Sequence, residues 1–592
     1  VLKALPATLT RGELLEKMVP LGSSDLTRLV EEYLPLILSR RHGDPSRPWN
    51  KFDIRLNDEE GEPIHHFEGN WRDIFQNWEA LAWSYPDFLD GFISKFVNAS
   101  TIDGFNPYRI TSAGVDWEAP DEDDPWVSIG YWGDHQIIYL LKLVELEAKV
   151  NPARLAESLD TPRYVFADVP YAFKSWEEIL KDPKDTITFD QERDEQLIAR
   201  KEKMGADGLL LQNDEGELCR ATLAEKLLLP AAVKLASLVP GGGVWMNTQK
   251  PEWNDANNAL AGYGLSVVTT AYLRRYIVFL ESLFVDHEQD DLQISSSLLG
   301  LLEGMSQVFS KESWSDQSKL TDGERFELVE HSGLILESYR GQILRGGPGA
   351  SSSISKSDLL EFLKKSRKAL EGALRLNKRS DGFWNAYNIL DIRHAESAMG
   401  IKELPLMLEG QVAILTSGML KPEEALHLLE ALPESDLKSE RHPTYLLYPD
   451  RDLPRFLEGN RISQEQLETV PALVEMVKAG DFRVLEKDPE EGFRFESAMT
   501  NGYELAEMIE TVGGFSEEDR TKLDALYESV FHHQSFTGRS GSMFSYEGLG
   551  CIYWHMISKL MLAAQEVALQ AIEDGVEDEM ITRFMGAYFS VQ

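Results

Sequence analysis

Apolar residues recur at the three- and four-residue spacing of an amphipathic helix along most of the chain. The pattern predicts helices within residues 1–42, from about Gly69, and in the buried run that follows Gln136. It also predicts helices over 223–238, 265–285, 291–311, 323–340, 356–376, 405–416, 422–432, 463–478, 498–512, 516–531 and 546–572. Because helices succeed one another through varied loops, we expect a mainly α protein, a helical toroid rather than a parallel sheet.

Two stretches interrupt the helical pattern. Residues 155–225 are charged and contain several prolines, so we predict an insertion with short strands and a hairpin turn near Gln212–Gly216. Residues 346–353, rich in Gly and Ser, form the strongest linker signal, and their shortness also fits a loop within a domain.

Composition narrows the class of protein. The chain has 592 residues, 43% of them hydrophobic, without an apolar run that approaches the roughly 20 residues of a membrane span. The net charge of −40 disfavours nucleic-acid and other polyanionic partners. Two cysteines, Cys219 and Cys551, form neither a disulfide framework nor a metal pattern, so we expect a cytoplasmic protein without a metal or an organic cofactor.

The densest cluster of candidate chemistry is the segment Gln249–Asn258. It places two carboxylates, Glu252 and Asp255, beside Trp253 and Asn254. An indole can cover a sugar ring, amides and acids can bond hydroxyls, and an acid can protonate a glycosidic oxygen. The alternative is a helix N-terminus with acidic residues in its first turn, which is common.

A second group of sugar-type side chains opens the helix near Gly69. Trp71, Arg72, Asp73 and Gln76 place aromatic, guanidinium, carboxylate and amide groups within two helical turns. An exposed charged face is the alternative, but such faces seldom carry this much aromatic and amide content.

Two further places offer candidate ligands. Asp134, His135 and Gln136 precede the buried helix, and the histidine there could equally be a helix cap. Thr537, Gly538 and Arg539 lie in a small-residue turn that suits an oxyanion such as phosphate, and the carboxylate of Glu547 follows.

Taken in chain order, these pieces resemble the catalytic barrel of glycoside hydrolase family 94, the cellobiose and chitobiose phosphorylases. The resemblance covers roughly residues 65–560 and rests on five pieces: Trp71-Arg72-Asp73 with Gln76, Glu252-Trp253-Asn254-Asp255, Asp381-Gly382-Phe383-Trp384 through Tyr387, Gln411, and Thr537-Gly538. It implies linker helices at 1–45 and an (α/α)6 barrel over 46–592. It also implies an N-terminal β-sandwich, which we expect to be missing here, and a homodimer.

The resemblance also implies a reaction. An inverting phosphorylase cleaves a β-linked gluco-oligosaccharide with inorganic phosphate and needs no second carboxylate as a base. Asp255 would be the acid, with Glu252 as the alternative. Trp71, Arg72, Asp73, Gln76, Asp134, His135, Gln136, Trp253 and Asn254 would bind the sugar, and Thr537, Gly538 and Arg539 would bind phosphate.

Three departures from the family keep an alternative open. Glu252 replaces the first Asp of the acid motif, and the family's phosphate-binding His has no clear counterpart near 493–500, where Glu496 stands. Glu547 is an extra carboxylate. An inverting hydrolase with Glu547 or Glu496 as the base is therefore the second hypothesis. A non-catalytic carbohydrate-binding protein and a polysaccharide lyase are less favoured.

Overall fold

The computed structural model describes residues 5–6, 8–34, 57–62, 64, 67–117, 119–120, 131–132, 136–248, 260, 262–392, 397–449, 461–489, 492–497, 499, 502–531, 552 and 554–592. For Val19, Asn70, Arg72, Asp73 and Trp132 it describes the backbone only. The chain forms two compact units, the first made of residues 1–254, 260–448 and 552–592, and the second of 255–259 and 449–551. The expected boundary at residue 45 falls outside the described residues and stays a prediction.

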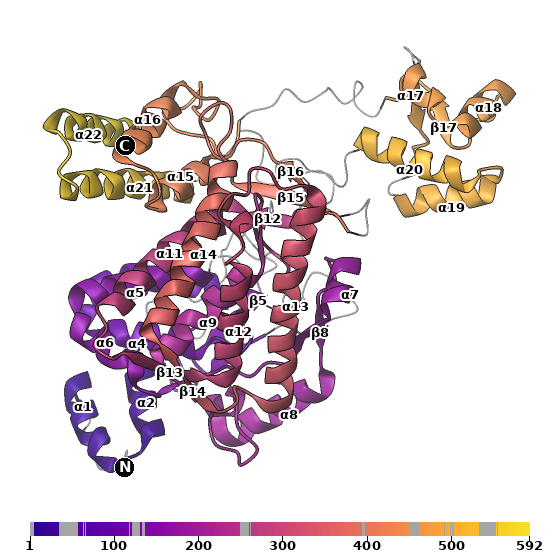
Figure 1. Ribbon diagram of the computed structural model, residues 1–592. Helices are drawn as coiled ribbons and strands as arrows, with labels where there is room; N and C mark the ends of the chain where they lie inside the picture. The colour runs from indigo at the N-terminus through magenta and orange to yellow at the C-terminus, as the bar shows by residue number, and fades with distance from the viewer. Residues whose placement is uncertain are drawn as a thin grey trace. The chain divides into compact units, whose positions relative to one another are not determined.

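Helices dominate the first unit, so a mainly α fold is confirmed (Figure 1). They are α1 (Arg11–Met18), α2 (Ser24–Glu32), α3 (Trp71–Ser84), α4 (Leu89–Asn98), α5 (Gln136–Val150), α6 (Pro152–Asp160), α7 (Trp176–Lys181), α8 (Gln191–Met204), α9 (Leu223–Ala236), α11 (Val267–Val285), α12 (Ser296–Val308), α13 (Asp322–Gly346), α14 (Lys356–Leu376), α15 (Leu408–Thr416), α16 (Pro422–Ala431), α21 (Trp554–Glu573) and α22 (Asp578–Val591).

The core of the first unit surrounds α9. Every residue of α9 is buried, and α9 contacts α6, α11, α12 and α13. Its N-terminus is capped by Thr222, whose side chain accepts a hydrogen bond from the backbone of Glu225. A helix that is buried on all sides has to be enclosed by others, and α9 therefore organises the packing of the unit.

A five-stranded antiparallel sheet, in the order β10-β11-β12-β15-β16, lies at one end of these helices, which we call the sheet end. Its strands are β10 (Leu238–Val239), β11 (Gly243–Trp245), β12 (Gly264–Ser266), β15 (Tyr387–Asp391) and β16 (Gly400–Glu403). Strand β10 follows α9 and β12 precedes α11, which fixes the sheet at those helix ends (Figure 1). Gly243 has a φ of +121°, and a Cβ there would lie 2.8 Å from the Ser266 backbone, so the β11–β12 pairing requires glycine.

The two interruptions of the helical pattern both lie in the first unit. Residues 155–225 contain the short strands β6 (Tyr164–Val165), β7 (Tyr171–Phe173), β8 (Ile187–Phe189) and β9 (Arg220–Ala221), and Gln212 and Leu218 bridge across the hairpin turn that we expected. The Gly-Ser stretch leads into β14 (Ser351–Ser355), which pairs with β13 (Asp291–Ser295). It is therefore a loop within the unit, and the helix predicted from residue 291 begins only at Ser296.

The second unit has its own hydrophobic core. Its elements are α17 (Gln464–Glu468), α18 (Pro471–Ala479), β17 (Leu485–Lys487), β18 (Phe493–Phe495), α19 (Gly502–Val512) and α20 (Glu517–Phe531). Leu473, Leu505 and Leu523 are fully buried in a cluster drawn from α18, α19 and α20. The helical pattern predicted α19 and α20, but the single helix predicted over 463–478 is divided into α17 and α18, because Pro471 begins the second helix. The pattern did not reveal that these helices form a separate unit.

A membrane-crossing helix is not found in the described part of the chain, since none of its helices is both long enough and apolar enough.

Candidate active site

The segment with the expected catalytic residues connects β11 to β12. Residues 249–259, and with them Glu252, Trp253, Asn254 and Asp255, lie outside the described residues. Both flanks are held by hydrogen bonds: the Trp245 indole donates to the Gly262 carbonyl at 2.7 Å, and the Thr186 hydroxyl donates to the Asn247 carbonyl at 2.9 Å. The ends of the segment are therefore fixed at the sheet end.

A buried polar network fixes the start of α5 at the same end. The Lys234 ammonium donates to the Gln136 Oε1 at 2.6 Å, and the Gln136 Nε2 donates to the Asn106 Oδ1 at 2.5 Å. All three side chains are at most 1% exposed. Burial of an ammonium is costly unless it is hydrogen-bonded, which explains why these groups are paired.

This network bears on three expected sugar ligands. The Gln136 amide is hydrogen-bonded to Lys234 and to Asn106, and these bonds hold the start of α5 in place. Asp134 and His135 immediately precede it and lie outside the described residues. On their other side, β5 (Tyr131–Trp132) pairs with β2 (Asn106–Pro107), so both flanks of residues 133–135 are anchored through Asn106 and its strand.

A second buried polar group lies next to β5. The Tyr131 hydroxyl donates to the Asp103 carboxylate at 2.7 Å, and burial raises the pKa of both groups. The Arg340 guanidinium lies 3.5 Å from the ring centroid of Phe173, and burial lowers its pKa to about 10. Among the described residues, its Nε and Nη2 atoms have no hydrogen-bond partner. The sequence did not reveal Arg340 or Lys234, because each is a single basic residue in a helix.

Trp71 at the start of α3 belongs to an aromatic cluster. It is 0% exposed, and its ring centroid lies 4.5 Å from Phe96, 4.9 Å from Phe75 and 6.2 Å from Tyr139. The indole is therefore enclosed by protein and packs α3 against α4 and α5. The side chains of Arg72 and Asp73 lie outside the described residues, and Gln76 is half-buried.

Two pieces of the family resemblance meet in the structure. The Gln411 Oε1 accepts from the backbone N–H of Trp384 at 3.0 Å, and its Nε2 donates to the Trp384 carbonyl at 2.8 Å. The Tyr387 hydroxyl donates to Glu409 at 3.1 Å. The starts of β15 and α15 are thereby joined at the sheet end, where Ser266 of β12 pairs with Tyr387.

A charged cluster attaches α21 to the core of the unit. Glu566 of α21 accepts from Arg275 at 2.7 Å, from Lys142 at 2.9 Å and from Thr416 at 2.8 Å. Burial would raise the pKa of Glu566, but Lys142 and Arg275 outweigh it and lower the pKa to about 2. The expected phosphate turn, Thr537, Gly538 and Arg539, and the carboxylate Glu547 precede α21 and lie outside the described residues.

The other expected base is described. Glu496 follows β18 in the second unit, its backbone N–H donates to the Val484 carbonyl at 3.0 Å, and the Ser497 hydroxyl donates to its carboxylate at 3.3 Å. Its role as a base stays a prediction. Within the described ranges, no three His, Cys, Asp or Glu side chains form a group that could hold a metal ion.

Comparison with known proteins matches one part of the chain. Residues 453–534 match the protein-family model described as GH149 phosphorylase insertion domain 2. The match points to a glycoside phosphorylase-like family. The matched residues lie within the 449–551 part of the second unit, so the sequence comparison falls on the part of the chain that packs separately. The match supports a carbohydrate-active enzyme and does not single out glycoside hydrolase family 94. No curated protein matches the chain.

Proposed function

We propose that this protein is an inverting glycoside phosphorylase that cleaves a β-linked gluco-oligosaccharide with inorganic phosphate and releases a sugar 1-phosphate. The match of residues 453–534 to a phosphorylase insertion domain carries the proposal. It is independent of the resemblance pieces, because none of the five lies within the matched range. The contact between Gln411 and Trp384 gives further support, since it joins two of those pieces.

In the proposed reaction, Asp255 protonates the glycosidic oxygen while phosphate attacks the anomeric carbon from the opposite face. Glu252 is the alternative acid. Thr537, Gly538 and Arg539 hold phosphate through backbone amides and one guanidinium. Arg72, Asp73, Gln76, Asp134 and His135 bind the sugar hydroxyls.

The described residues contribute by positioning. The Lys234–Gln136–Asn106 network fixes both flanks of residues 133–135, and the bonds at Trp245 and Asn247 fix both flanks of the acid segment. Fixed flanks keep reacting groups close to the geometry of attack, which is a large part of enzymatic rate enhancement.

The decisive experiment incubates the protein with β-linked gluco-oligosaccharides, with and without inorganic phosphate, and identifies the products by 31P and 1H NMR. We expect phosphate-dependent release of a sugar 1-phosphate in the α configuration, because a single displacement inverts the β linkage. Absence of sugar 1-phosphate at saturating phosphate with every oligosaccharide would contradict the proposal.

The second candidate is an inverting glycoside hydrolase, favoured by the extra carboxylates Glu547 and Glu496. A hydrolase of this kind needs a carboxylate base to activate water. It predicts release of reducing sugar at the same rate without phosphate, and loss of that release in Glu547→Gln or Glu496→Gln.

A further inference from the structure

A cavity of about 360 Å³ lies between α2, the end of α4, the β3–β4 hairpin and the short helix η4 (Gly205–Leu209) in the first unit. Strands β3 (Arg109–Thr111) and β4 (Gly114–Asp116) form this hairpin. None of the expected catalytic or sugar-binding residues lines the cavity. Its volume lies within the ordinary range for small-molecule sites.

One wall of the cavity is charged, and most of its charges are already paired. The Arg28 guanidinium donates to Glu32 Oε1 at 3.0 Å and to Asp207 Oδ2 at 2.7 Å, and the Asn98 amide donates to the same Glu32 oxygen at 2.6 Å. Arg28 is only 3% exposed. These bonds engage Arg28 and one carboxylate oxygen of Glu32, so they form a fixed wall.

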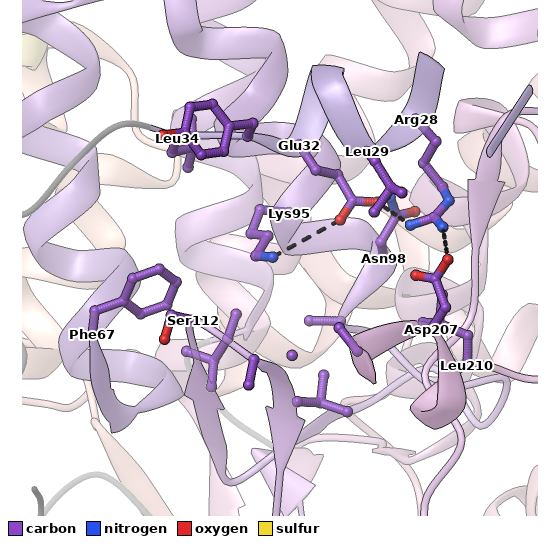
Figure 2. A pocket seen from close by; sticks show the side chains of 17 residues that line it. Arg28, Leu29, Glu32, Leu34, Phe67, Lys95, Asn98, Ser112, Asp207 and Leu210 are labelled. Carbon is purple, nitrogen blue, oxygen red and sulfur yellow. Dashed lines mark hydrogen bonds and ion pairs between the residues drawn. The ribbon is translucent and has the colours of Figure 1, made fainter. Parts of the chain in front are cut away.

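Two polar atoms in the cavity retain unused hydrogen-bonding capacity. The Lys95 Nζ lies 3.9 Å from Glu32 Oε2, beyond hydrogen-bond length, and it makes no hydrogen bond among the described residues. Among the described residues, Lys95 is the one polar partner of Glu32 Oε2. Figure 2 shows Lys95 between the Arg28–Glu32–Asp207 wall and the wall that carries Phe67 and Ser112. A donor and an acceptor therefore stand side by side, 3.9 Å apart.

The remaining wall is mostly apolar, with Ser112 and Tyr33 as its polar side chains. Leu29, Leu34, Ile110, Val115 and Leu210 line it, together with the Phe67 ring. The four charged groups, Arg28 and Lys95 against Glu32 and Asp207, sum to zero. A charged ligand would leave these partly buried groups with a surplus charge, whereas a neutral ligand would not.

We infer that this cavity binds a small, uncharged amphipathic alcohol, whose hydroxyl accepts a hydrogen bond from Lys95 and donates one to Glu32 while its apolar body covers Phe67, Ile110 and Val115. A hydroxyl is a group that both donates and accepts, and an oxygen beside the pair can lie about 2.8 Å from Nζ and about 2.8 Å from Oε2, at the apex of a triangle with them. An ammonium has no acceptor and a carboxylate no donor, so neither satisfies both atoms.

The test compares three molecules of nearly one shape: 2-phenylethanol, 2-phenylethylamine (a cation at neutral pH) and ethylbenzene. Binding to the full chain is measured by saturation-transfer NMR and by titration calorimetry. We expect 2-phenylethanol to bind about tenfold or more tightly than the other two, because a hydrogen bond to a charged group has about that effect. Equal binding of ethylbenzene, or no binding of 2-phenylethanol at millimolar concentration, would overturn the inference.

Two variants locate the binding. Lys95→Met removes the hydrogen-bond donor and keeps an unbranched side chain. It should lower the affinity for 2-phenylethanol about tenfold and leave the affinity for ethylbenzene unchanged. Ala113 is an exposed residue that lines the cavity, and the larger side chain in Ala113→Trp should prevent binding of all three molecules. Lys149→Met, at an exposed lysine of α5, is the matched control and should bind as the wild type does. Unchanged affinity in both Lys95→Met and Ala113→Trp would place the ligand elsewhere and refute the assignment. Thermal unfolding of each variant verifies that it is folded.

Discussion

The buried ammonium of Lys234 donates a 2.6 Å hydrogen bond to Gln136 across 98 positions of sequence, and the same amide donates to Asn106. The end of α9, the start of α5 and strand β2 are thereby joined at one point of the sheet end. The first residues of α5 are consequently held by two elements, α9 and β2, that are distant from α5 in the sequence.

Loss of this ammonium should affect both stability and catalysis. Lys234→Met leaves the Gln136 oxygen without its donor in the core, and we expect a loss of about 1–3 kcal/mol in the free energy of unfolding. We also expect a lower kcat/KM, because residues 133–135 lose an anchor. Urea unfolding and steady-state kinetics measure the two effects, and the exposed Lys149→Met is the control. Wild-type stability and kinetics in Lys234→Met would show that the network is dispensable.

The cluster around Glu566 should give acid-dependent stability. Its pKa of about 2 in the folded protein is below the ordinary 4.5, so its contribution is present above pH 4.5 and is lost as the pH falls towards 2. We expect about 3 kcal/mol from this group. Glu566→Gln should therefore lose stability at pH 7 and show a smaller additional loss between pH 5 and 3 than the wild type, by urea unfolding at each pH. If the free energy of unfolding changed with pH in the same way in Glu566→Gln and in the wild type, the prediction would be contradicted.

Glu147 on α5 should have the opposite pH dependence. It is 3% exposed, and burial together with the nearby Asp90 raises its pKa to about 7, although Arg154, Arg11 and Arg163 oppose the shift. Between pH 4.5 and about 7 the folded protein therefore holds a proton that the unfolded chain has lost, so stability declines across this range and changes little above it. Glu147→Gln should be about 1–3 kcal/mol more stable than the wild type at pH 8 and close to it at pH 4.5. Urea unfolding at the two pH values measures the difference, and absence of a gain at pH 8 in Glu147→Gln would refute the shifted titration.

A core substitution in the second unit should destabilise that unit and leave the first unit unaffected. Leu523→Ala removes a fully buried side chain from its core and should cost about 2–5 kcal/mol there. Hydrogen exchange should become faster in α17–α20 while the amides of α9 keep their protection. Phe482→Ala, at a side chain that is 41% exposed, is the control and should have little effect. Equal acceleration in α9 would mean that the two units unfold together.

The proposed acid can be tested through the leaving group. Asp255→Asn should lower kcat about 10²–10⁴-fold on an oligosaccharide, because general acid catalysis typically contributes that much. The decrease in kcat should be far smaller with 2,4-dinitrophenyl β-glucoside as the substrate, because its leaving group departs without being protonated. Asp214→Asn, at an exposed turn position, is the control. If Glu252→Gln shows this difference between substrates and Asp255→Asn does not, Glu252 is the acid.

The sequence by itself determined most helices and the chemistry to look for. The predicted range 356–376 coincides with α14, because a long amphipathic repeat between a serine cap and a terminal asparagine leaves little choice of ends. The residues around Trp384 and Gln411 were also identified from sequence, and the structure joins them. Local periodicity and short motifs suffice for such features because neighbouring residues carry the signal.

Only the tertiary structure decided how these parts combine. The strands of the five-stranded sheet have two to five residues each, too few for an alternating pattern to be visible, and pairing of distant segments creates them. Trp71 became an enclosed core residue through rings on α4 and α5, and Arg340 became a buried cation through its contact with Phe173. The second unit exists because side chains of α18, α19 and α20 cover one another. Burial and pairing of this kind depend on contacts between residues far apart in the chain, which no local pattern records.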